Sequence, residues 1–111
     1  MFSCCPTGTG AVYEVAIRFT DPSIKKEYAN WLSSRHINEV LQCDGFLSAE
    51  LLSEYKGDGL VVRYVLESPA VFDNYDRSEI AKKLRQEAIE KFGSRFAAAR
   101  RVLTSENVFF K

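Results

Sequence analysis

The order of the periodic segments limits the fold of this chain more than any other feature. Four segments alternate apolar and polar residues as β-strands do, and they lie at residues 12–19, 46–55, 60–66 and about 98–105. Two regions between them repeat apolar residues at helical spacing, from Asp21 to about Gln42 and from Ser68 to Phe92. The order β-α-β-β-α-β predicts an α+β, ferredoxin-like fold, with an antiparallel four-stranded sheet and both helices on one face.

Turn-forming and helix-capping residues support the predicted ends of these helices and strands. Asp21 is suited to cap a helix, and Pro22 is suited to its first position. Gly45 is expected to end this helix, because glycine readily adopts the left-handed cap conformation. Residues 56–59, Lys-Gly-Asp-Gly, predict a turn that joins the second and third strands as a hairpin. The second helical region is expected to break near residues 74–78, to run again from 79 to 92, and to stop at Gly93.

Length and composition indicate one folded domain. The chain has 111 residues, and a hydrophobic share of 46% is too high for a disordered protein. Residues 1–10 are expected to form a disordered tail, and residues 11–106 the folded domain. Residues 107–111 are expected to form a C-terminal tail, whose apolar Val108-Phe109-Phe110 either adds a short edge strand or crosses to a partner.

Charge and cysteine content limit the partners and the compartment. Lys plus Arg and Asp plus Glu number 15 each, which argues against nucleic acid or an anionic membrane as the main partner, since both usually require a basic excess. No apolar run approaches membrane-spanning length. Cys4, Cys5 and Cys43 form no disulfide or metal-ligand pattern, so a reducing cytoplasm is expected. Cys4 and Cys5 are either free thiols of the tail or sites of palmitoylation.

The sheet face without helices must meet water, a ligand or another subunit. Alternation places these residues on it: Val12, Glu14, Ala16 and Arg18 from the first strand, Ser48, Glu50, Leu52 and Glu54 from the second, and Val61, Arg63 and Val65 from the third. The last strand contributes either Arg100 with Val102 or Arg101 with Leu103, because a slip of one residue reverses the face. The apolar members of this set predict a symmetric homodimer through the open sheet face.

The first helical region contains a break in phase at the only His of the chain. At helical spacing, Ile24, Tyr28 and Trp31 point one way, whereas Val40 and Leu41 point nearly the opposite way. Either the helix kinks near residues 34–36, where Ser weakens it, or its second half packs on something else, such as a partner chain.

His36 lies at this break, and two roles compete for it. In the functional role it is a general acid or base, or a metal ligand, that faces a cavity. In the structural role it hydrogen-bonds a carbonyl or a carboxylate and fixes the helix. A metal site is not expected, because Glu14, Glu39 and Glu50 show no ligand spacing. No cofactor is expected either, since the chain has no phosphate loop and no dinucleotide fingerprint.

An ordered set of short segments resembles the family of small proteins grouped as DUF4286. The matching segments are Tyr13-Glu14-Val15, Trp31-Leu32, His36-Ile37, Val40-Leu41, Gly45-Phe46, the run from Arg63 to Ser68, the run from Phe92 to Phe96, and Arg100-Arg101-Val102-Leu103. The resemblance implies a dimeric α+β barrel, in which two ferredoxin-like sheets face each other. That superfamily includes cofactor-independent monooxygenases, polyketide cyclases, haem-degrading enzymes and stress-response proteins, so the resemblance implies a fold and a dimer but no particular reaction.

Two functions follow as hypotheses, and whether the protein is an enzyme stays open. In the first, the protein binds or transforms a small organic molecule in a pocket between helices and sheet. His36 would transfer a proton, Tyr64 or Tyr13 would orient the molecule, and Arg63 or Arg18 would meet an anionic oxygen. In the second, it is a non-catalytic dimeric module for protein interaction or stress response. Haem binding through His36 is a third, weaker hypothesis.

Overall fold

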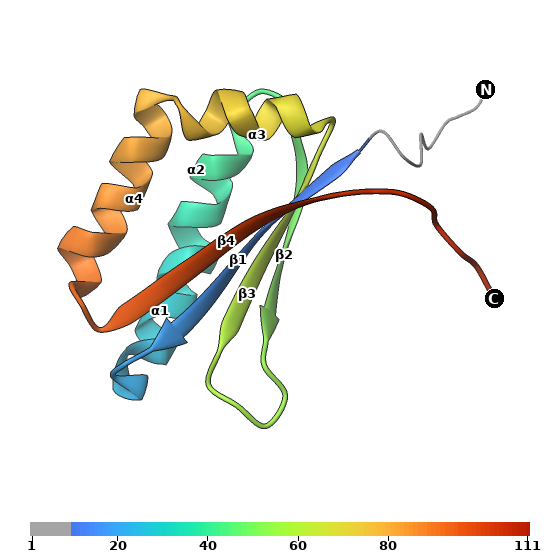
Figure 1. Cartoon of the computed structure of the whole chain (residues 1–111). Helices are drawn as coiled ribbons and strands as arrows, with labels where there is room; N and C mark the ends of the chain where they lie inside the picture. Colours follow the sequence, from blue (N-terminus) through green and yellow to red (C-terminus); the bar gives the residue numbers. More distant parts are fainter. Residues whose placement is uncertain (1–9) are drawn as a thin grey trace.

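A computed structural model describes residues 10–111 and shows the predicted sheet. The strands are β1 (Ala11–Phe19), β2 (Phe46–Ser53), β3 (Leu60–Leu66) and β4 (Phe96–Thr104). All neighbouring pairs are antiparallel, in the order β2-β3-β1-β4. The helices cover one face of this sheet (Figure 1), so the chain has the ferredoxin-like fold that the sequence predicts. The predictions for Cys4, Cys5 and nearly all of the N-terminal tail lie outside the described residues.

The helices also lie where the sequence places them. The first helical region consists of a short 3-10 turn (Pro22–Ile24), α1 (Lys25–Trp31), a π-turn (Leu32–His36) and α2 (Ile37–Leu41). The second consists of α3 (Pro69–Asp76) and α4 (Glu79–Phe92), which confirms the predicted break. Ser78 restarts the helix, because its hydroxyl accepts a hydrogen bond from the backbone N–H of Ala81 at 3.2 Å. None of the helices in residues 10–111 is long and apolar enough to cross a membrane.

The π-turn explains the break in helical phase. The backbone N–H of Ile37 bonds the carbonyl of Leu32, five residues earlier, so this turn holds one residue more than an α-helical turn. The extra residue rotates α2 back toward the sheet, and Val40 is therefore buried in the same core as Trp31. The hydroxyl of Ser34 donates to the carbonyl of Asn30 at 2.7 Å, a contact that bends helices. The predicted irregularity of the helix is confirmed. The apolar side of α2 is buried within the single chain, so no partner is needed to cover it.

The register of β4 settles the question that the sequence left open. Arg101 lies opposite Glu14, and Arg100 lies opposite Val15. Since Val15 packs against the core, Arg100 and Val102 are on the helix side, whereas Arg101 and Leu103 are on the open face. β4 also starts two residues earlier than predicted, because the pairing of β1 with β4 extends to Phe96.

The open face is partly apolar, and the C-terminal segment extends beyond it. Val65 and Leu103 are 38% and 41% exposed on this face. After β4 the chain leaves the sheet on the side away from the helices (Figure 1), and residues 105–111 form no helix or strand. Phe109 and Phe110 in this segment are 88% and 91% exposed. The predicted short edge strand is therefore absent from the single chain.

Candidate functional site

A cavity of about 340 Å³ lies between the helix side of the sheet and the helices. The sheet supplies Tyr13, Val15, Ile17, Val62, Tyr64, Phe96, Ala97, Ala98 and Arg100, and the helical regions with the turn after α4 supply Tyr28, Leu32, His36, Val40, Tyr75, Arg85, Ala88, Ile89 and Gly93. The volume falls in the range of small-molecule sites, and the lining is apolar and aromatic with a few polar groups, as such sites usually are.

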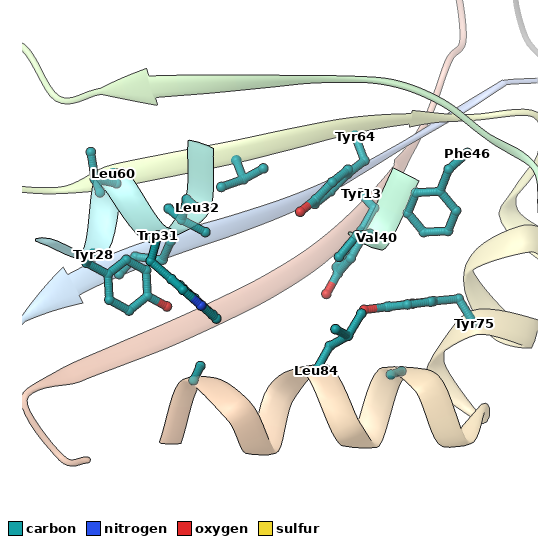
Figure 2. Close-up of a cluster of buried hydrophobic side chains, with 14 of the residues drawn as sticks. Tyr13, Tyr28, Trp31, Leu32, Val40, Phe46, Leu60, Tyr64, Tyr75 and Leu84 are labelled. Atoms are coloured by element: carbon teal, nitrogen blue, oxygen red, sulfur yellow. The ribbon is translucent and has the colours of Figure 1, made fainter. Parts of the chain in front are cut away.

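Four tyrosines give this cavity its character. The rings of Tyr13 and Tyr64 stack with centroids 5.6 Å apart, and Tyr75 tilts against Tyr13 at 6.1 Å. Figure 2 shows the hydroxyls of Tyr13 and Tyr75 turned toward the space between the sheet and α4. Burial raises the pKa of Tyr28 to about 12 and also raises the pKa values of Tyr64 and Tyr75. These phenols are neutral near pH 7, so each can both donate and accept a hydrogen bond.

The π-turn places His36 at the cavity. The imidazole stacks on the indole of Trp31, with centroids 4.4 Å apart and planes 24° from parallel. Its Nδ1 atom is buried, and within residues 10–111 it has no hydrogen-bond partner. Burial lowers the pKa of His36 from 6.5 to about 4, Glu87 opposes that shift, and Arg100 adds to it. The ring is therefore neutral near pH 7, with one N–H donor and one acceptor nitrogen.

Two arginines are the charged residues of the lining. Arg85 pairs with Asp76 at 2.8 Å and donates to the hydroxyl of Tyr13 at 3.5 Å. Arg100 forms no ion pair within residues 10–111, and it lines the cavity from β4. No carboxylate is part of the lining. The cavity therefore combines neutral hydrogen-bonding groups with positive charge.

The other predicted site residues lie on the opposite face of the sheet. Arg18 and Arg63 line a shallow hollow of about 560 Å³ on the open face, with Glu14 and Arg101. The carboxylate of Glu14, a residue only 7% exposed, accepts hydrogen bonds from Arg63 at 2.8 Å and Arg101 at 2.9 Å. The hydrogen bond from Arg63 is the largest cause of the lowered pKa of Glu14, and Arg101 lowers this pKa further, although burial acts in the opposite direction.

The structure thus brings together part of the predicted site. His36, Tyr13 and Tyr64 line one cavity, whereas the sheet separates Arg18 and Arg63 from it. Sequence reasoning missed Arg85, and it missed Tyr75 because a tyrosine in an amphipathic helix reads as ordinary core. Within residues 10–111 no group of three or more His, Cys, Asp or Glu side chains is placed to hold a metal ion.

The neutral state of His36 predicts a dependence of stability on pH. Because the pKa in the folded state is lowered from 6.5 to about 4, the unfolded chain binds this proton more readily between those values. The part of the free energy of unfolding that depends on neutral His36 is complete above pH 6.5 and is lost as the pH falls toward 4. Between pH 7 and pH 5 the loss is about 2 kcal/mol. Urea denaturation at these two pH values should show a larger loss for the wild type than for His36→Gln. An equal loss in the two proteins would mean that His36 is not held neutral.

Solved structures of several other proteins share the fold of this chain. A monooxygenase from the gene ActVA-Orf6 of Streptomyces coelicolor, in complex with the ligand Nanaomycin D, has a TM-score of 0.74 at 17% identity, over 93% of each chain. SnoaB, a cofactor-independent oxygenase from Streptomyces nogalater, has a TM-score of 0.69 at 12% identity, over 93% of this chain and 99% of that one. A dimeric ferredoxin-like protein from an uncultured marine organism has a TM-score of 0.69 at 11% identity, over 93% of this chain and all of its own. At these identities the likeness shows the fold alone.

The family is shown by the sequence itself. None of the curated proteins compared with this chain is a match. The profile of the Domain of unknown function (DUF4286) matches residues 11–106, the whole sheet and every helix. The resemblance drawn from the ordered short segments is therefore confirmed, and the chain belongs to the DUF4286 family.

Proposed function

We propose that the protein binds a small organic molecule in the tyrosine-lined cavity and presents a neutral His36 to it. The observation that carries this proposal is the buried Nδ1 of His36, which has no partner within residues 10–111. An unpaired buried polar atom costs about 1–3 kcal/mol, so a ligand that satisfies it gains an interaction that the empty protein lacks. The fold supports the proposal, since one protein that shares it is described in complex with Nanaomycin D.

The chemistry of the cavity suits a molecule with an aromatic surface and polar edges. The rings of Tyr13, Tyr64 and Tyr75 offer flat apolar contacts, and their hydroxyls can orient an oxygen of the ligand. With a pKa lowered to about 4 by burial, His36 is a weak base. We expect His36 to act first as a hydrogen-bond partner. It would exchange a proton only with a ligand whose own charge raises the pKa of His36.

The single Trp of the chain reports on this site, because Trp31 stacks directly on His36. The test is a fluorescence titration of Trp31 with neutral bicyclic aromatic compounds, 2-naphthamide among them. We expect saturable quenching, and an affinity about tenfold lower in His36→Gln, which corresponds to the loss of one buried hydrogen bond. Asn38→Gln, an exposed change on α2, is the control and should bind as the wild type does. Absence of binding throughout the panel would contradict the proposal.

The second part of the proposal is a homodimer through the open sheet face. The exposed apolar residues on this face, Val65 and Leu103, lie close to the ion cluster in which Arg63 and Arg101 neutralise the buried carboxylate of Glu14. A protein with the same fold is described as dimeric. The C-terminal segment leaves the sheet on this side (Figure 1), where a stacked second sheet would cover Phe109 and Phe110.

Sedimentation velocity of matched lysine variants tests the dimer. Val65 and Ile80 are similarly exposed, at 38% and 42%, but Val65 lies on the open face and Ile80 lies on α4. We expect Val65→Lys to shift the dimer to monomer, because it buries two unpaired charges at the symmetric interface, and Ile80→Lys to remain dimeric. A wild type that is monomeric at micromolar concentration would rule the dimer out.

The alternative function is a non-catalytic dimeric module, which would use the same face but bind no ligand in the cavity. The Trp31 titration therefore distinguishes the two functions.

A further inference from the structure

The charges that line the cavity are of one sign, although the chain as a whole is balanced. Lys plus Arg and Asp plus Glu number 15 each in the sequence. The charged residues among those that line the cavity are Arg85 and Arg100. Asp76 and Glu87 lie nearby but outside the lining, and each is paired with an arginine: Asp76 with Arg85 at 2.8 Å, and Glu87 with Arg35 at 3.5 Å. The cavity therefore presents an excess of positive charge to whatever enters it.

Most of that excess comes from Arg100. The charge of Arg85 is compensated by Asp76, and the ion pairs among the described residues include none for Arg100. The field of Arg100 reaches groups on three separate elements: it opposes the rise that burial causes in two tyrosine pKa values, and it adds to the lowering that burial causes in the His36 pKa. These groups are Tyr28 on α1, His36 in the π-turn and Tyr75 on α3. Arg100 is itself exposed and also lines the cavity, so an incoming anion can reach its guanidinium from solvent.

We propose that the ligand is a planar aromatic anion of the carboxylate class, whose acid group binds the guanidinium of Arg100 and whose ring lies among the tyrosines. This inference rests on the function proposed above. A planar guanidinium forms two parallel hydrogen bonds with a carboxylate, which gives both orientation and affinity. The buried Nδ1 of His36 can meet a second polar group of the same molecule. A cationic ligand would meet the charges of Arg85 and Arg100 with no acid in the lining to offset them.

A pair of ligands with nearly the same shape tests the charge directly. Binding of 2-naphthoate and of 2-naphthamide to the full chain is measured by isothermal titration calorimetry at low and at high salt. We expect the wild type to bind 2-naphthoate about tenfold more tightly than 2-naphthamide, with the difference shrinking as salt rises. Arg100→Gln should remove the preference, and Arg100→Lys should keep part of it because it retains the charge without the planar fork. Lys83→Gln, which removes an exposed positive charge from α4, should leave the preference unchanged.

The possible results distinguish the choice of an anionic ligand from small-molecule binding in the cavity. Equal binding of the two compounds by the wild type would overturn the anion assignment and leave the cavity as a binding site for neutral aromatic molecules. A preference for 2-naphthoate that persists in Arg100→Gln would exclude Arg100 as the anion partner. If neither compound binds, both the anion assignment and the proposed function fail. Far-UV circular dichroism of Arg100→Gln confirms that it is folded, and the salt dependence in the wild type tests the charge without any variant.

Discussion

Replacing Ala98 by Phe is expected to abolish small-molecule binding while the fold is retained. Ala98 lies on β4 opposite Ile17, so its side chain is on the helix side of the sheet, and it lines the cavity. A benzene ring occupies a cavity of roughly 150 Å³, so the new side chain takes up about half of the 340 Å³ available. A ligand would have to displace that ring, and we expect the affinity for 2-naphthoate to fall by about a hundredfold or more, which corresponds to about 3 kcal/mol.

The comparison variant is Ala70→Phe, which makes the same change at an exposed position of α3. It should bind as the wild type does. Thermal denaturation should show that Ala98→Phe is no less stable than Ala70→Phe, because the added ring fills space that is already present. Unchanged affinity in a folded Ala98→Phe would place the binding site elsewhere, and the hollow on the open face would then be the first surface to examine.

Phe92→Ala is expected to cause the largest loss of stability. Phe92 is the last residue of α4 and is 1% exposed. Its ring contacts Tyr28 and Trp31 with centroids 4.6 Å and 5.6 Å away, so it joins the first helical region to the second at the end of the cavity. Truncation of a buried Phe costs about 3–5 kcal/mol through lost burial and the space left behind. For a domain of this size we expect the melting temperature to fall by roughly 15 °C.

Ile89→Ala on the same helix is the matched control. Ile89 is 54% exposed, so its truncation should cost less than about 1 kcal/mol. The measurement is urea denaturation followed by far-UV circular dichroism. A loss of under about 1 kcal/mol for Phe92→Ala would mean that the aromatic cluster does not hold the two helical regions together.

The strands and their order could be predicted because local pattern determines them. Alternation identifies β1, β2 and β3, and the turn at residues 56–59 makes the hairpin. The face of β4 could not be predicted, because the pairs Arg100 with Val102 and Arg101 with Leu103 are equivalent in pattern. Pairing with β1 decides between them, and there Arg101 meets the buried Glu14. That contact joins residues far apart in the sequence, so no local signal contains it.

The candidate site was predicted in part for a related reason. The phase break identified His36, and alternation identified Tyr13 and Tyr64 on the face that the helices cover. Alternation already places Arg18 and Arg63 on the opposite face, where the structure has them, so the hypothesis that joins them to His36 in one pocket does not follow from the strand pattern. The π-turn was also out of reach, since the sequence shows where helical phase changes but not that one extra residue in a turn restores it.

The location of a bound ligand decides whether the cavity on the helix side of the sheet is the binding site. Isotope-filtered NMR of the labelled protein with bound 2-naphthoate would detect contacts between the ring protons of the ligand and nearby side chains. We expect contacts to Tyr64, Ala98 and His36, which line the cavity on the helix side of the sheet. Contacts confined to Val61 and Leu52, on the open face, would contradict it.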